Sequence, residues 1–242
     1  MRARPVIILC RLTCPAFNLP YFDCFCTYAQ GEESFLNRLL IFLIAGWSGF
    51  FLMAVELLSG RMLAPSFGSS IQVWGAILTV FMLALAIGYL IGGRLSVKDP
   101  SIAKLSIILL TAAAVTTPAV LLGDQVMDRV YTLILDPRYG CLVAAALLFF
   151  IPTMIAGMVS PYAVRLLVSE CRLSGRCAGY LFFVSTFGSA AGTLLTSFYL
   201  VLYLDMDQIF WVLIAVSGSL GLFALLFDLL RFKMVDMEQK RL

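Results

Sequence analysis

The sequence contains no histidine, and charged residues make up only 13% of its 242 positions. Histidine is the commonest metal ligand in proteins and the usual side chain for proton transfer near neutral pH. Its absence therefore argues against a histidine-based metal centre and against ordinary acid–base catalysis. We expect no metal site, no cofactor and no enzymatic activity of the chain's own.

Neither the seven cysteines nor the glycines supply a substitute for that chemistry. Cys10 and Cys14 form a C-x3-C spacing and Cys24 and Cys26 a C-x-C spacing, but a zinc site needs matched pairs with further partners. We expect reduced cytoplasmic thiols. The sequence also has no G-x-G-x-x-G and no P-loop, which excludes a recognisable nucleotide-type cofactor site.

What the sequence has in abundance is apolar residues. They make up 62% of the chain, and the mean hydropathy is +0.99, whereas soluble domains are about 45–50% apolar and about 25% charged. A bilayer core of about 30 Å needs roughly 20 mostly apolar residues per helix. Ten-residue alternating segments, the pattern of a membrane β-barrel, are absent. The composition therefore predicts an all-α, polytopic membrane helix bundle.

The transmembrane domain is expected over residues 36–230, between an N-terminal cytoplasmic extension at 1–35 and a basic cytoplasmic tail at 231–242. Pro152 and Pro161 should kink or end the fourth span, because each removes a backbone donor. The segment after Pro161 should lie along the interface with Arg165 on its polar side. The six expected spans are 39–58, 72–92, 103–123, 141–159, 178–201 and 209–230.

Basic residues predict the orientation of these spans. Of the 17 Lys and Arg residues, 14 fall in segments on one side of the membrane and 3 on the other. The positive-inside rule then places both termini in the cytoplasm of a plasma (inner) membrane. The net charge of +3 is no sign of nucleic-acid binding, because the basic residues are spread over joints beside anionic lipid.

Two stretches carry small residues one helical turn apart. Gly88 and Gly92 lie in the second span, and Gly188 and Gly192 in the fifth. Such spacing lets helix backbones approach closely in lipid. The hydroxyls of Ser185, Ser189, Thr193 and Thr196 extend the second stretch. They have two interpretations: further packing contacts, or the polar lining of a substrate path.

The stretch "ELLSGRMLAPSFGSS", residues 56–70, begins with an acid at the expected end of the first span. We expect Glu56 to lie about one turn inside the membrane, deep enough to need a partner. Arg61 is five residues away, so the two could pair only if the helix breaks between them. Pro65 and Gly68 should shape an outer turn that ends at Ser70, a candidate cap for the second span.

Four motifs, in order on successive helices, resemble the membrane portion of the spermidine-synthase-like membrane proteins. They are E-x4-R-x-L-A-P-x-F-G-S-S-x-x-V-W-G-A-I-L-x-V-F from Glu56, GYLIGGRL from Gly88, GMVSPYAVRL from Gly157 and STFGSAAGT from Ser185. That family joins a major-facilitator-like membrane half to an aminopropyltransferase domain. The resemblance covers roughly residues 36–230 and implies half of a major-facilitator fold.

The motifs also supply the candidate site residues. For substrate binding these are Glu56, Arg61, Trp74, Tyr89, Ser185, Ser189 and Thr193. For turns and packing they are Pro65, Gly68, Gly88, Gly92, Gly93, Arg94, Pro152, Gly157, Pro161, Arg165, Gly188 and Gly192.

Two departures from the family limit what the resemblance implies. Val97 stands where the turn after the second span usually carries an acid, and the chain ends twelve residues after its last expected span, without the catalytic domain. We therefore expect a membrane subunit or anchor for a separately encoded aminopropyltransferase-like protein. The alternative is a transporter half for a small organic cation such as a polyamine, with Glu56 as counter-charge and a homodimer or partner completing the path.

Overall fold

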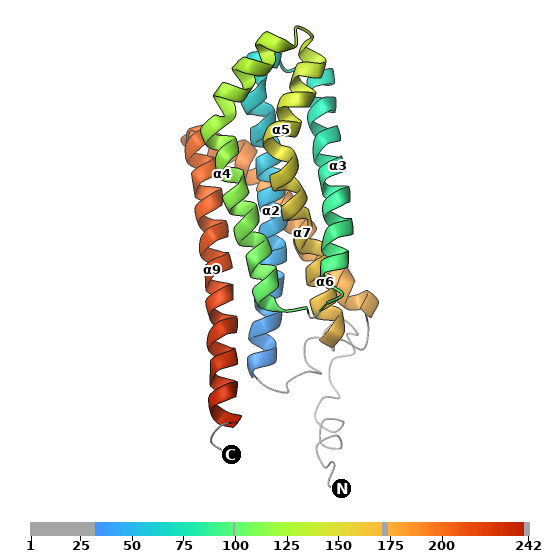
Figure 1. Cartoon of the computed structure of the whole chain (residues 1–242), viewed down its shortest axis with the longest axis vertical. Helices are drawn as coiled ribbons and strands as arrows, with labels where there is room; N and C mark the ends of the chain where they lie inside the picture. The colour runs from blue at the N-terminus through green and yellow to red at the C-terminus, as the bar shows by residue number, and fades with distance from the viewer. Residues whose placement is uncertain (1–31, 99, 171–173, 240–242) are drawn as a thin grey trace. The chain divides into compact units, whose positions relative to one another are not determined.

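The computed structural model of the chain describes residues 32–98, 100–170 and 174–239. Within these ranges every regular element is a helix and no strand occurs, which confirms the expected all-α fold. Residues 1–31 of the expected N-terminal extension lie outside the described residues, and from Asn37 onward the chain forms one compact unit. Its helices, shown in Figure 1, are α2 (Glu32–Phe67), α3 (Ile71–Leu95), α4 (Ile102–Leu133), α5 (Pro137–Gly157), α6 (Val159–Glu170), α7 (Ser174–Leu195), the π-helical η2 (Thr196–Leu200), α8 (Val201–Tyr203) and α9 (Met206–Gln239).

Six of the described helical stretches are long and apolar enough to cross a bilayer. This confirms a multi-pass membrane protein, although several helices run further than expected. They extend because apolar residues keep their helical spacing past the expected span ends. Met127 and Val130 are buried near the end of α4, while Asp124 and Asp128 are exposed. The stretches are Leu36–Phe67, Ile71–Leu95, Ile102–Leu133, Pro137–Val168, Gly175–Tyr203 and Met206–Leu230.

The expected turn after the first span is shorter than the sequence suggested. Pro65 lies inside the last turn of α2 and not in the loop, because buried Leu63 and Phe67 hold the helix together on either side of it. Gly68 then takes a φ of +82°, which favours glycine. Ser70 caps α3, accepting a hydrogen bond from the backbone N–H of Val73 at 3.4 Å, as expected.

The fourth span is divided into two helices near its expected end at residue 159. α5 continues through Pro152 to Gly157, and the chain re-starts as α6 at Val159, with Pro161 in the first turn where a missing N–H costs no helical bond. α6 packs one face on the bundle through buried Tyr162, while Arg165 is exposed.

The expectation of reduced thiols is wrong at Cys177, which is disulfide-bonded. Cys141, by contrast, is a free, buried thiol. The N-terminal cysteines lie outside the described residues.

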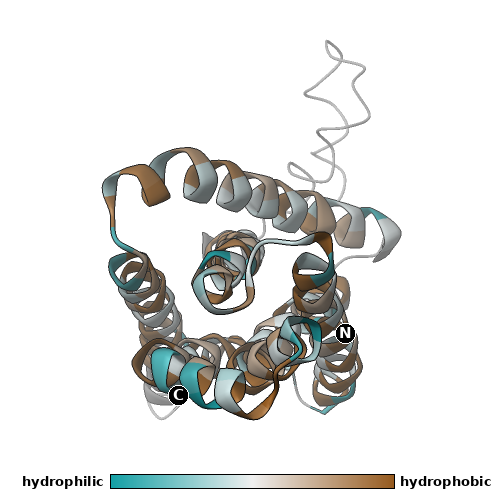
Figure 2. Ribbon diagram, turned by 90° about the horizontal axis from the view of Figure 1, so that it is seen from above, coloured by the Kyte–Doolittle hydropathy of each residue, from teal (hydrophilic) through white to brown (hydrophobic). Residues whose placement is uncertain are grey.

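α2 is the helix that the others surround. Figures 1 and 2 show it in the middle of the bundle, with α7 crossing it obliquely. Its Trp47 donates a hydrogen bond to Ser217 of α9 at 2.8 Å, and its Ser48 donates to the carbonyl of Ala156 of α5 at 3.3 Å. On another side, Gly60 lies against the ring of Trp74 of α3. A single helix therefore contacts most of the bundle.

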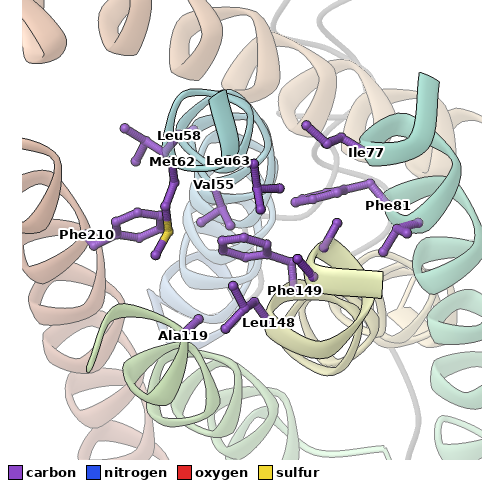
Figure 3. Close-up of a cluster of buried hydrophobic side chains, with 14 of the residues drawn as sticks. Val55, Leu58, Met62, Leu63, Ile77, Phe81, Ala119, Leu148, Phe149 and Phe210 are labelled. Carbon is purple, nitrogen blue, oxygen red and sulfur yellow. The ribbon is translucent and has the colours of Figure 1, made fainter. Parts of the chain in front are cut away.

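The largest core cluster fills the space on one flank of α2. Figure 3 shows Val55 and Leu63 of α2 beside Phe149 of α5, with Phe81 of α3 on one side and Phe210 of α9 on the other. The Phe149 ring centroid lies 6.0 Å from that of Phe81 and 6.4 Å from that of Phe210. Three helices thus contact α2 through one row of neighbouring phenylalanine rings.

Glycines permit the closest backbone contacts. A Cβ on Gly188 of α7 would strike the carbonyl of Gly46 of α2 and lie 3.1 Å from its Cα. A Cβ on Gly192 would lie 2.9 Å from the Cα of Phe50. α3 and α5 make a similar approach, because a Cβ on Gly92 would lie 2.7 Å from the Cα of Met158, and Gly88 lies against the carbonyl of Met154.

The N-terminus of α4 ties three helices together. Asp228 of α9 accepts a hydrogen bond from the N–H of Ala103 at 3.1 Å, and the Tyr162 hydroxyl of α6 accepts one from the N–H of Ser101, also at 3.1 Å. Negative charge is favourable at a helix N-terminus. These bonds satisfy backbone donors that the helix leaves unpaired.

Replacing Gly188 with Val should destabilise the bundle by about 1–3 kcal/mol or more, because the new side chain overpacks the α2–α7 contact. Thermal unfolding of the purified protein in detergent measures the effect. Gly179→Val is the matched control, since a Cβ there meets no atom within 4 Å. Equal losses in the two variants would show that helix propensity, and not the close approach, sets the cost.

A cysteine placed at Ser69 should react from outside intact cells with a membrane-impermeant maleimide, and one at Val97 should react only after the membrane is opened. Both positions are exposed and lie at opposite ends of α3. The experiment uses a cysteine-free background. The reverse labelling pattern would overturn the orientation that the basic residues predict.

Candidate functional site

Glu56 lies within α2 and is only 7% exposed. Among the described residues its carboxylate has no ion-pair or hydrogen-bond partner. α2 continues for eleven residues beyond Glu56, which at 1.5 Å per residue places the acid about 16 Å from the helix end. α2 therefore continues past residue 58, where the first span was expected to end, and the depth of Glu56 in the membrane stays a prediction.

Three positions of α2 share the face that carries Glu56. At about 100° per residue, Gly49, Glu56 and Gly60 fall within about 40° of one another around the helix. A Cβ on Gly60 would lie 2.5 Å from the ring of Trp74, and one on Gly49 would lie 2.8 Å from the hydroxyl oxygen of Ser189. Glu56 thus occupies the face of α2 that meets Trp74 at one level and α7 hydroxyls at another.

Two α7 hydroxyls on this side donate to carbonyls of their own helix, which leaves their oxygens available as hydrogen-bond acceptors. Ser189 donates to the carbonyl of Ser185 at 3.1 Å, and Thr193 donates to the carbonyl of Ser189 at 3.0 Å. Because each hydrogen is used within the helix, each oxygen keeps lone pairs for another donor. Ser185, Ser189 and Thr193 are all half-buried, so they can accept hydrogen bonds from a ligand that carries N–H groups.

Two further hydroxyls are buried: that of Thr196, which was expected to extend the row of Ser185, Ser189 and Thr193, and that of Thr153, which was not among the expected site residues. Thr196 of η2 is 1% exposed and Thr153 of α5 is 2% exposed, and neither hydroxyl oxygen has a hydrogen-bond partner among the described residues. Gly192 of α7 lies against Phe50 of α2. One turn further along both helices, Thr196 lies at the level of Ala54, which is two residues from Glu56. π-helical turns are frequent at functional sites. No residue pattern in the sequence predicts the π-helical turn at Thr196–Leu200.

Two expected substrate-binding residues do not join Glu56. Arg61 is exposed and lies about 140° around α2 from Glu56. The helix is unbroken between them, since Ser59 donates back to the carbonyl of Glu56 at 2.7 Å, and no ion pair forms. Tyr89 is 46% exposed, on a different face of α3 from Gly88. It also lies about four turns along α3 from Trp74.

The expected turn and packing residues lie mostly at the other end of the bundle. Gly157 ends α5 with Leu85 against it, Arg94 is exposed in the last turn of α3, and a Cβ on Gly93 would meet nothing within 4 Å. With Pro161 and Arg165 on α6, they surround the α3–α4 turn. They support the bundle at a distance from Glu56.

Glu56→Gln should raise the thermal stability of the purified protein, because it removes a carboxylate that is buried without a partner. Asp228→Asn provides the contrast: this carboxylate caps α4, so its loss should lower stability by about 0.3–2 kcal/mol. If both substitutions lowered stability alike, Glu56 would have to make a structural bond of its own.

Comparison with known proteins found no family model, no curated protein and no solved structure that matches this chain. A functional assignment therefore rests on the geometry of the α2 face around Glu56.

Proposed function

We propose that this chain is a membrane protein that binds a small organic cation at Glu56 and acts as one half of a transporter for it. The observation that carries the proposal is the burial of Glu56 without a partner. Burying an unpaired charge costs several kcal/mol, so an acid inside a membrane span is by default a functional candidate. A bound cation would offset that cost.

The surroundings of Glu56 suit an ammonium group. Gly60, which lies against the Trp74 ring, is four residues from Glu56, about 6 Å along α2, so that ring can stabilise an ammonium group at Glu56 by a cation–π contact. Gly49, which lies at the Ser189 hydroxyl, is seven residues from Glu56 in the other direction, about 10 Å along the helix. The hydroxyls of Ser185 and Ser189 can therefore accept hydrogens from a second amino group of an extended ligand. A calcium-like metal ion would need six to eight oxygen ligands, whereas an amine needs one carboxylate and a few acceptors. The resemblance to the spermidine-synthase-like membrane proteins makes a polyamine the first ligand to test.

The position of Glu56 also suits transport. Binding sites of transporters lie near the middle of the membrane, between helix groups that rock against each other. Gly60 lies at the level of Trp74, so Glu56 lies about one turn deeper than Trp74. The six spans are half the number of a major-facilitator transporter, and a second copy of the chain would complete the path.

Titration of spermidine against the purified protein tests the proposal. We expect saturable binding, a loss of affinity of at least tenfold in Glu56→Gln, and a smaller loss in Ser189→Ala. Asp128→Asn, an exposed acid of α4, is the matched control and should bind as the natural protein does. Absence of binding at millimolar spermidine, or equal binding by Glu56→Gln, would contradict the proposal.

A second candidate function is docking of a separately encoded aminopropyltransferase-like enzyme. The observation in its favour is the length of α9, which runs from Met206 to Gln239, further than the roughly 20 residues that a bilayer core needs. A helix of that length would give a partner a helical segment outside the bilayer to bind. This function predicts co-purification of such an enzyme with the full chain, and loss of the enzyme when residues 231–242 are removed.

A further inference from the structure

A cavity of about 600 Å³ lies where the fifth span turns into α9. It is separate from the face that carries Glu56, because the residue that α2 contributes to it is Arg61, on another side of that helix. The cavity is lined by Arg61, Val201, Leu202, Tyr203, Leu204, Asp205, Met206 and Gln208.

The local course of the chain makes this cavity. The π-helical turn Thr196–Leu200 is followed by the single turn of α8, and at Leu204 the backbone becomes extended, with φ −127° and ψ 147°. α9 then begins, with the N–H of Ile209 donating to the carbonyl of Asp205 at 3.0 Å. The extended residue between the two helices opens the corner that Arg61 faces.

The side chains at the start of α9 leave one carboxylate available. Gln208 accepts a hydrogen bond from the N–H of Asp205 at 3.3 Å, which is one half of a capping box. In the other half the Asp205 side chain would accept from the N–H of Gln208, but among the described residues Asp205 has no such bond. Its carboxylate is exposed at the cavity.

Arg61 presents the opposite charge to the same cavity. Among the described residues its guanidinium has neither a hydrogen bond nor an ion pair, with Asp205 or with any other acid. Two opposite charges that line one cavity without touching can both be paired by a ligand that carries both signs. A guanidinium binds carboxylate or phosphate through two parallel hydrogen bonds, and a carboxylate accepts from an ammonium group.

We infer that this cavity is a second ligand site, for a small zwitterion whose carboxylate or phosphate binds Arg61 and whose ammonium group binds Asp205. A ligand with one charge would leave either Arg61 or Asp205 unpaired, so both charges are required for tight binding. Two sources carry this chemistry: a free amino acid, and the head group of a zwitterionic phospholipid at the membrane surface.

The test uses the full chain and ligands matched in size. β-Alanine, γ-aminobutyrate and ε-aminocaproate carry both charges at increasing separation, while propionate and propylamine each carry one. We expect at least one of the three amino acids, or phosphatidylethanolamine, to bind. The single-charge compounds should bind at least tenfold more weakly than the best zwitterion. Equal binding of propionate or propylamine would overturn the inference.

A lipid arm distinguishes the two sources. The protein is released from nanodiscs of phosphatidylethanolamine or of phosphatidylglycerol, and the retained lipid is counted by mass spectrometry. Retention of phosphatidylethanolamine without amino-acid binding identifies the head group, and the reverse identifies a free solute. Failure of both the three amino acids and phosphatidylethanolamine to bind would overturn the inference.

Substitutions test whether Arg61 and Asp205 bind the ligand. Arg61→Gln and Asp205→Asn should each lower the affinity, or the retained lipid, at least tenfold, and the double exchange Arg61→Asp with Asp205→Arg should restore part of it. Arg129→Gln and Asp128→Asn, which alter exposed charges of α4, are the matched controls and should change binding less than twofold. Unchanged binding in Arg61→Gln or in Asp205→Asn would contradict the assignment.

Discussion

The close approach of α2 and α7 is the contact on which the rest of the structure depends. Lipid is as apolar as the helices, so these helices associate through fitted surfaces and not by exclusion from water. Gly46 and Gly188 allow two backbones to touch. α2 can then lie inside the bundle, where Trp47 bonds α9 and Ser48 bonds α5. A helix in that position buries most of its side chains, and Glu56 is one of them.

Much of the helical plan could be predicted from residue type alone, because six long apolar stretches in a chain of few charges have few alternatives in a bilayer. Ser70 was expected as a cap for the same local reason, and the structure confirms it. The residues at which the helices end were harder to predict. α2 continues past Pro65 because Leu63 and Phe67 are buried by neighbouring helices, and α5 continues through Pro152. Tertiary packing, which no local pattern displays, decides both.

Some features of the candidate site could likewise be predicted from the sequence, and others could not. Glu56 and Ser189 could be nominated as polar residues of expected spans, and Trp74 from the motif that begins at Glu56. Only the phase of α2 shows that one face of one helix meets both Trp74 and Ser189. Helix phase also separates Arg61 from Glu56, although the two are five residues apart. The cavity at Arg61 and Asp205 follows from a π-helical turn and an extended Leu204. Neither feature has a marker in the residues themselves.

Protection of Glu56 from a membrane-soluble carbodiimide tests the central claim most directly, because the reagent reacts with carboxyl groups inside the bilayer and the modified residue can be identified by mass spectrometry. If Glu56 binds an organic cation, spermidine should lower labelling at Glu56 in a saturable way while labelling at the exposed Asp128 stays unchanged. Labelling of Glu56 that is the same with and without saturating spermidine would contradict the account.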